Sequence, residues 1–171
     1  MPTNPPKQSV GRAQVRSTLA SFISPPAISG INQVFTSFPK RINFQVNALP
    51  SQINRCAAVV FIEAETESRI ANGGVDAGWK RIDYTVVIQL FHHSLAREAE
   101  DAMADLDNII DDLKELLRSG AHRLGDESGI LVWQAAEPTI DVSYGEPLSQ
   151  NGTSTETWAS MRFTVTQMIQ A

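Results

Sequence analysis

The chain has few of the residues and runs that define several classes of protein. Cys56 is the one cysteine among 171 residues, so a disulfide within the chain is excluded, and we expect this thiol to be a small buried hydrophobe. No apolar run approaches the roughly 18 residues of a membrane span, and the N-terminus lacks the charged start and apolar core of a signal peptide. The sequence therefore predicts a protein of the reducing cytoplasm with no membrane segment.

Motifs for catalysis and ligand binding are also lacking. His92 and His93 are adjacent on an extended segment and point opposite ways, and His122 stands alone beyond a helix, so no pair has metal-ligand spacing. Cys56 lies mid-strand rather than at an exposed elbow. The acidic helix face lacks EF-hand spacing, and GGVDAG lacks the order of a phosphate cradle. We therefore expect no enzyme activity, no catalytic residue, no metal site and no cofactor.

The composition fits one domain with a substantial core. Hydrophobic residues make up 42% of the chain, and 19 acidic against 14 basic side chains give a net charge of −5. Residues 1–10, which contain three prolines and little to bury, are predicted to be a flexible arm, and residues 11–171 a single α+β domain. The acidic balance argues against a nucleic-acid clamp, but it is compatible with a wall past which DNA moves without being bound.

One stretch, from Lys80 to Gly120, organises the prediction of the fold. Its first part alternates with a period of two, which indicates a half-buried strand from Lys80 to Phe91. The apolar face of this strand comprises Ile82, Tyr84, Val86, Ile88 and Leu90. The other face carries Arg81, Asp83, Thr85 and Gln89.

A long acidic helix is predicted directly after this strand, from Leu95 to Ser119. Its apolar residues recur every three or four positions and form one stripe, which makes it the expected backing of a sheet. They are Leu95, Ala99, Met103, Leu106, Ile109, Ile110, Leu113, Leu116 and Leu117. Ser94 is the expected N-terminal cap, and Gly120 can close the helix.

The remaining elements are one short helix and several strands. The helix is expected at Arg12–Ile23, stopped by Pro25 and Pro26 and packed on the sheet edge or on a neighbouring subunit. Strands are expected at 31–38 and 42–46 near an edge, at 56–65 paired with 80–91, and at 130–135, 139–144 and 158–169. Asn72-Gly73-Gly74 is a turn signal at the tip of a hairpin, and 145–156 is expected to be a loop.

These elements predict an α+β fold, with a single mixed, largely antiparallel sheet packed by one long helix and the short N-terminal helix. The second face of the strands is mixed in character. It carries Arg81, Thr85, Val87, Gln89 and Phe91 on one strand and Arg162, Thr164 and Thr166 on another. Two readings stay open: a partner protein covers this face, or the second helix lies on it.

The order of elements, together with several phrases, resembles the tail terminator (tail completion, or minor tail) proteins of long-tailed bacteriophages. The matching phrases are CAAVVFIEAE, GWKRIDYTVVIQLF with Trp79, EAEDAMADLDNIIDDLKELL and ETWASMRFTVTQMI with Trp158. The resemblance covers most of the chain from Arg12 onward and is one of pattern rather than of a single motif. The segment from Pro39 to Arg55 is longer than such proteins need.

This resemblance implies a structural virion protein of the tail or neck, assembled in the host cytoplasm. Such a protein forms a hexameric ring at the head-proximal end of the tail tube, ends tube polymerisation and joins the head connector or stopper protein. DNA passes through the channel without specific binding. A closed ring needs a heterologous interface, in which different faces of each subunit meet.

Eight residues are therefore candidates for docking surfaces. Arg69, Asn72, Asp76, Gln150 and Asn151 belong to the two loops, and Arg81, Thr85 and Gln89 to the second strand face. Two other classes of protein remain alternatives. One is a neighbouring head-to-tail joining protein of the same neck, and the other is a small α+β enzyme or ligand-binding module, which needs a pocket of perturbed polar groups.

Overall fold

The computed structural model describes residues 11–40, 42, 55–71, 78–95, 98–119, 131–133, 139–150 and 154–170. The expected flexible arm at residues 1–10, the strand predicted at 42–46 except for Ile42, and the turn at Asn72-Gly73-Gly74 lie outside the described residues. The elements are α1 (Gly11–Ile23), β1 (Ile31–Phe35), β2 (Arg55–Ala71), β3 (Trp79–Ser94), α2 (Ala99–Ser119), β4 (Leu131–Trp133), β5 (Asp141–Tyr144), β6 (Leu148–Gln150) and β7 (Ser154–Gln170).

All the strands belong to one sheet, with the order β1-β2-β3-β7-β4, and β5 and β6 also pair with β7. β1 is parallel to β2, and every other pairing is antiparallel. The predicted mixed, largely antiparallel α+β fold is confirmed. So is the central place of the strand that contains Lys80–Phe91, since β3 lies between β2 and β7.

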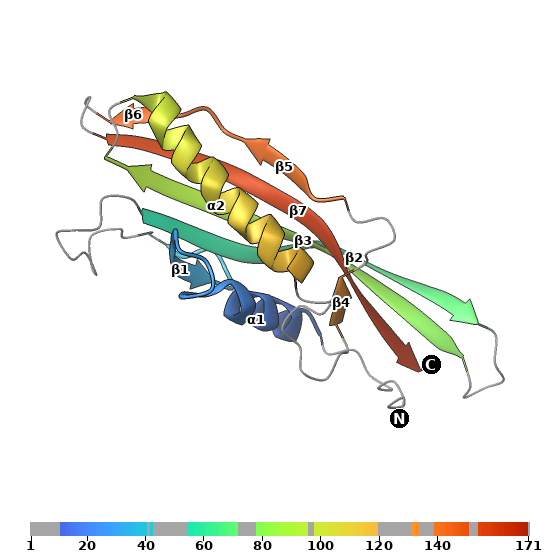
Figure 1. Cartoon of the computed structure of the whole chain (residues 1–171). Coiled ribbons are helices and arrows are strands. Elements are labelled where there is room, and N and C mark those ends of the chain that lie inside the picture. Colours follow the sequence, from blue (N-terminus) through green and yellow to red (C-terminus); the bar gives the residue numbers. More distant parts are fainter. Residues whose placement is uncertain are drawn as a thin grey trace.

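β2, β3 and β7 form a long three-stranded ribbon. The register pairs β3 with β2 from Arg55↔His93 to Ala71↔Trp79, and with β7 from Ser94↔Thr155 to Trp79↔Gln170. At one end the three strands continue past both helices (Figure 1). We call the paired residues at this end, 66–71, 79–83 and 166–170, the arm.

Both helices lie on the same face of the sheet (Figure 1). α1 contacts β2 and β1 near one edge, and α2 crosses β3 and β7. Leu106, Ile110 and Leu113 of α2 form one core with Tyr84 and Val86 of β3, all nearly inaccessible to solvent. The second helix therefore does not cover the opposite face, and no described helix lies there. This excludes the reading in which the second helix lies on that face.

The start of the long helix was predicted wrongly. α2 begins at Ala99, not at Leu95, and Leu95 is 52% exposed instead of belonging to the apolar stripe. Ser94 ends β3 as a buried residue instead of capping the helix. The reason is tertiary: His92, His93 and Ser94 have cross-strand partners in β7, so strand pairing extends three residues beyond the predicted end.

Two further strand predictions need correction. The expected loop at 145–156 contains β6, which pairs with Ser154–Glu156 at the start of β7. Strict alternation in the sequence predicts Glu63, Glu65 and Glu67 on one side of β2, but the register shifts between Ile62 and Ala64. Glu63 pairs with Arg162 of β7, whereas Glu65 pairs with Arg12 of α1. A bulge re-aims side chains in this way because one extra residue inverts the alternation.

Candidate interaction face

The face of the sheet opposite the helices is the candidate site. On β3 it carries the odd-numbered residues from Arg81 to His93, which are half-buried apart from the buried Val87. Their partners on β7 include Trp158, Ser160, Arg162, Thr164 and Thr166. Polar and apolar residues are mixed along this face, which is the composition of a surface that another protein can cover.

Hydrogen bonds already hold much of its polar surface. Arg81 Nε lies 2.9 Å from Asp83 Oδ1, and Thr166 Oγ1 donates to the same oxygen at 2.6 Å. Gln89 Oε1 accepts a bond from Ser160 Oγ at 2.6 Å. Two of the candidate docking residues, Arg81 and Gln89, are thus fixed by neighbours, and a partner would meet rigid groups rather than mobile ones.

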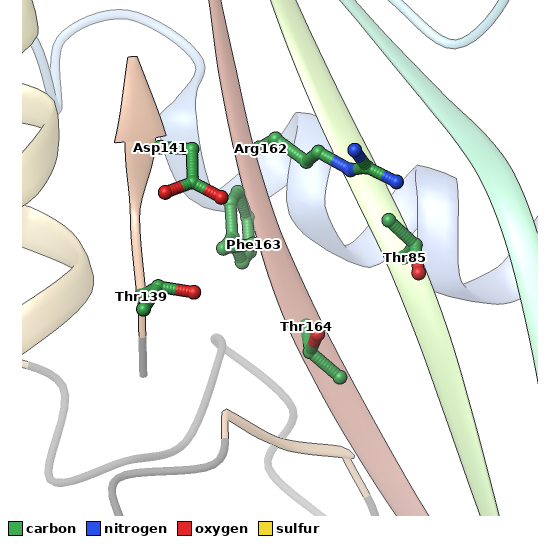
Figure 2. Close-up of a pocket in the computed structure, with 6 residues that line it drawn as sticks. All are labelled: Thr85, Thr139, Asp141, Arg162, Phe163 and Thr164. Carbon is green, nitrogen blue, oxygen red and sulfur yellow. The ribbon is translucent and has the colours of Figure 1, made fainter. Parts of the chain in front are cut away.

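The third candidate on this face, Thr85, lines a cavity of ≈ 210 Å³ together with Thr139, Asp141, Arg162, Phe163 and Thr164. Figure 2 shows Arg162 reaching from β7 toward β3, with Asp141 on the other side of β7. Arg162 is neutralised by Glu63, whose Oε2 lies 2.8 Å from the guanidinium. The cavity therefore offers hydroxyls and a satisfied ion pair, which suit hydrogen bonds to a polar loop of a partner.

Aromatic side chains gather toward the other end of this face. Phe38, which is 59% exposed, stacks at 47° on Phe61 with ring centroids 5.1 Å apart. A cavity of ≈ 310 Å³ lies nearby in the sheet and is lined by Ile42, Phe91, His92, Glu156, Thr157 and Trp158. Exposed aromatic rings beside a cavity are typical anchor points for a partner.

The arm carries exposed apolar residues that sequence analysis did not select. Ile70 is 52% exposed, Trp79 39% and Met168 38%. Trp79 and Met168 lie on the helix-free face, since Trp79 has the same parity on β3 as Arg81 and Met168 pairs with Arg81. Arg69 is exposed on the same arm.

The remaining loop candidates are only partly placed. Gln150 is the last residue of β6, and its side chain is not among those described. Asn72, Asp76 and Asn151 lie outside the described residues. Of the five loop candidates, the structure thus places only the side chain of Arg69. Arg69 lies near the end of the sheet that is remote from β6.

Cys56 and His92 lie on the other side of the sheet from this face. Cys56 is fully buried, and burial raises the pKa of its thiol to about 12. His92 is 2% exposed with its Nδ1 3.2 Å from Thr157 Oγ1, and burial lowers its pKa. His93 points to the other face, 3.8 Å from Glu156, and His122 is not described. Within the described ranges, no three Cys, His, Asp or Glu side chains are grouped so as to hold a metal ion.

The fold and this face define an α+β domain with helices on one side of its sheet and a partly polar, partly aromatic surface on the other. No helix in the described part of the chain is long and apolar enough to cross a membrane.

Comparisons with known proteins find similarity among solved structures only. No protein family model matches it, and no curated protein matches it. Among solved structures it is similar to a chain of the virion of a native gene transfer agent particle, with 10% identity and a TM-score of 0.24 over 90% of this chain and 91% of that chain. At this identity and TM-score the similarity carries no argument about fold or function.

Proposed function

We propose that the chain is a structural virion protein that forms a ring on the head-proximal end of a phage tail tube. In this role it ends tube polymerisation, joins the tail to the head connector or stopper, and leaves a channel for DNA. The observation that carries the proposal is the one-sided sheet. Its helix-free face and its projecting arm expose Phe38, Ile70, Trp79 and Met168, and a monomer gains nothing from exposing such side chains.

The sequence pattern and the charge support the same role. The elements follow in the order that resembles tail terminator proteins, and the sheet is completed by the strand that carries Trp158. The net charge of −5 gives a channel that repels the phosphate backbone and does not retain it. Assembly in the host cytoplasm and a place in the tail or neck follow from this proposed role.

Loss of the protein gives the decisive test. A stop codon early in its gene is expected to yield full heads without tails, together with tubes of uncontrolled and extended length, because nothing ends polymerisation. Expression of the intact gene in trans should restore tails of one length. Electron microscopy of the particles measures both quantities.

The same experiment separates the proposal from its nearest alternative. Loss of a neck protein that acts after termination leaves tails of normal length that are not joined to heads. Normal tails on normal heads contradict any role in tail completion. Purified chain mixed with tail tubes should also form rings at one tube end, as seen by negative-stain microscopy, and tubes without such end rings argue against the terminator role.

A further inference from the structure

The two lateral edges of the sheet differ in how they are finished. On one side, β7 is covered in succession by β6 at Ser154–Glu156, by β5 at Ala159–Arg162 and by β4 at Val165–Gln167. On the other side, β2 is covered by β1 only at Cys56–Val59. From Val60 to Arg69 the outer edge of β2 has no strand beside it in the described part of the chain. We call this segment the open β2 edge.

An uncovered strand of this length is a template for another strand, because its outward N–H and C=O groups have no partner in a sheet. Natural edges are often protected by unpaired charges. Here the three glutamates of the open β2 edge are neutralised within the molecule by Arg162 at 2.8 Å, by Arg12 and by Lys80 at 2.7 Å. These paired glutamates therefore exert no net repulsion on an incoming strand.

We propose that the open β2 edge of one copy pairs with the outer edge of β5 (Asp141–Tyr144) in the next copy, so that the sheet continues from subunit to subunit. This inference rests on the proposed function, and it names the interface that closes the ring. β5 borders only β7 among the described strands, so no described strand pairs with its other edge. Asp141, Ser143 and Tyr144 are exposed there.

Three features favour a second copy as the occupant. The two uncovered edges lie on opposite sides of one sheet, so the contact is heterologous and can close into a ring. The strand directions agree: β2 runs parallel to β7 and therefore antiparallel to β5, and a rotation about an axis along the strands keeps this relation. The charges complement each other, since Arg69 on the open β2 edge and Asp141 on β5 form no ion pair with described residues.

The register requires the neighbour to be displaced along the strands. Within one copy, Tyr144 is level with Ala58 of β2 through Ala159 and Leu90. β1 occupies that part of β2, so β5 of the next copy has to move toward the arm by at least two residues, about 7 Å at roughly 3.3 Å per residue. Ser143 beside Thr66, with Asp141 next to Arg69, takes a displacement of about seven residues, roughly 23 Å at that rise. Such a stagger is what a closed sheet needs, because closure tilts the strands against the axis.

The test uses cysteines placed on the two edges. The double variant Thr66→Cys with Ser143→Cys, introduced into the gene and recovered in purified particles, is treated with a short bismaleimide. We expect a ladder of covalent multimers of the chain that ends in one closed ring species. Cys56 needs no replacement because it is fully buried and its pKa is raised to about 12. The controls are each single variant and the double variant Ser17→Cys with Ser143→Cys. Ser17 is exposed on α1. All of these controls should remain monomeric after treatment.

The outcomes separate this interface from the proposed function. Rings on the tubes without a ladder overturn the interface and leave the function standing, whereas absence of the chain from particles overturns the function. Dimers from Thr66→Cys alone show a symmetric β2 to β2 contact and overturn the proposal. Charge reversal gives an independent measurement: Arg69→Asp should lower the yield of rings several-fold, and adding Asp141→Arg should restore it. Equal yields for the single and the double reversal contradict the pairing.

Discussion

Gly145 provides the sharpest test of the packing that holds β5 and β6 on the sheet. It lies between these two strands, and its N–H donates to the carbonyl of Trp158 at 3.0 Å. A Cβ at Gly145 would overlap Nε1 and Cε2 of the Trp158 indole, whereas ordinary contacts stand at 3.4–4 Å. Its φ is not in the left-handed region, so Gly145→Ala changes the contact and leaves the backbone conformation allowed.

The expected cost follows from this overlap. To relieve the overlap, either the Trp158 indole has to shift from its position or the β5–β6 connection has to separate from β7. Overpacking of this kind costs about 1–3 kcal/mol. For a domain of this size, about 2 kcal/mol corresponds to a fall in Tm of roughly 4–8 °C.

Urea and thermal unfolding followed by circular dichroism measure this change. Glu146→Ala, at the neighbouring exposed position, is the matched control and should stay within about 0.5 kcal/mol of the parent. In the background of Trp158→Val, the additional cost of Gly145→Ala should disappear, because the ring that it meets is gone. A Gly145→Ala variant as stable as the parent, or an equal cost in both backgrounds, refutes the placement of Gly145 against Trp158.

Four further predictions concern single side chains. Leu113→Ala, at a fully buried position of α2, should lower the free energy of unfolding by about 2–5 kcal/mol in a urea titration. Tyr144→Phe removes the 2.8 Å bond to Asp107 that ties β5 to α2, and should cost about 0.5–1.5 kcal/mol in the same assay. Burial lowers the pKa of His92 from 6.5, so the folded state binds fewer protons than the unfolded state. The contribution of His92 to the free energy of unfolding is therefore full above pH 6.5, and the free energy of unfolding falls below pH 6.5 by at most about 1.4 kcal/mol per pH unit. His92→Gln should flatten that slope. Cys56 should resist a thiol reagent in the native protein and react fully in urea, so rapid native labelling would contradict its burial.

The main secondary structure could be predicted because it depends on local periodicity. Ile82, Tyr84 and Val86 recur at every second position and are buried, and Leu106, Ile110 and Leu113 recur at helical spacing and pack on them. Boundaries were less predictable. His92, His93 and Ser94 read as a joint between strand and helix, but their partners in β7 lie more than sixty residues away in the chain, as the His92–Thr157 contact shows.

The candidate site could be predicted only in part, for the same reason. The alternation of Arg81, Thr85 and Gln89 indicated a second face, but it did not show that Gln89 is bonded to Ser160 or that Arg81 is bonded to Asp83. Composition also could not select Trp79 and Met168, because apolar residues on strands are usually buried. Their exposure arises from their place on the helix-free face of the sheet, where Met168 pairs with Arg81, and this is a property of the assembled sheet.

The sequence by itself determined that this chain forms a sheet with one long amphipathic helix, because hydrophobic periods of two and of 3.6 residues are local features. It also determined the acidic charge and the lack of a recognisable catalytic motif. Only the tertiary structure decided that both helices share one face, that β4, β5 and β6 cover one edge of β7, and that no described strand borders the outer edge of β2 beyond Val59. These properties depend on which distant strands pair, and pairing is decided by the combined burial and hydrogen bonding of the whole sheet rather than by any one segment.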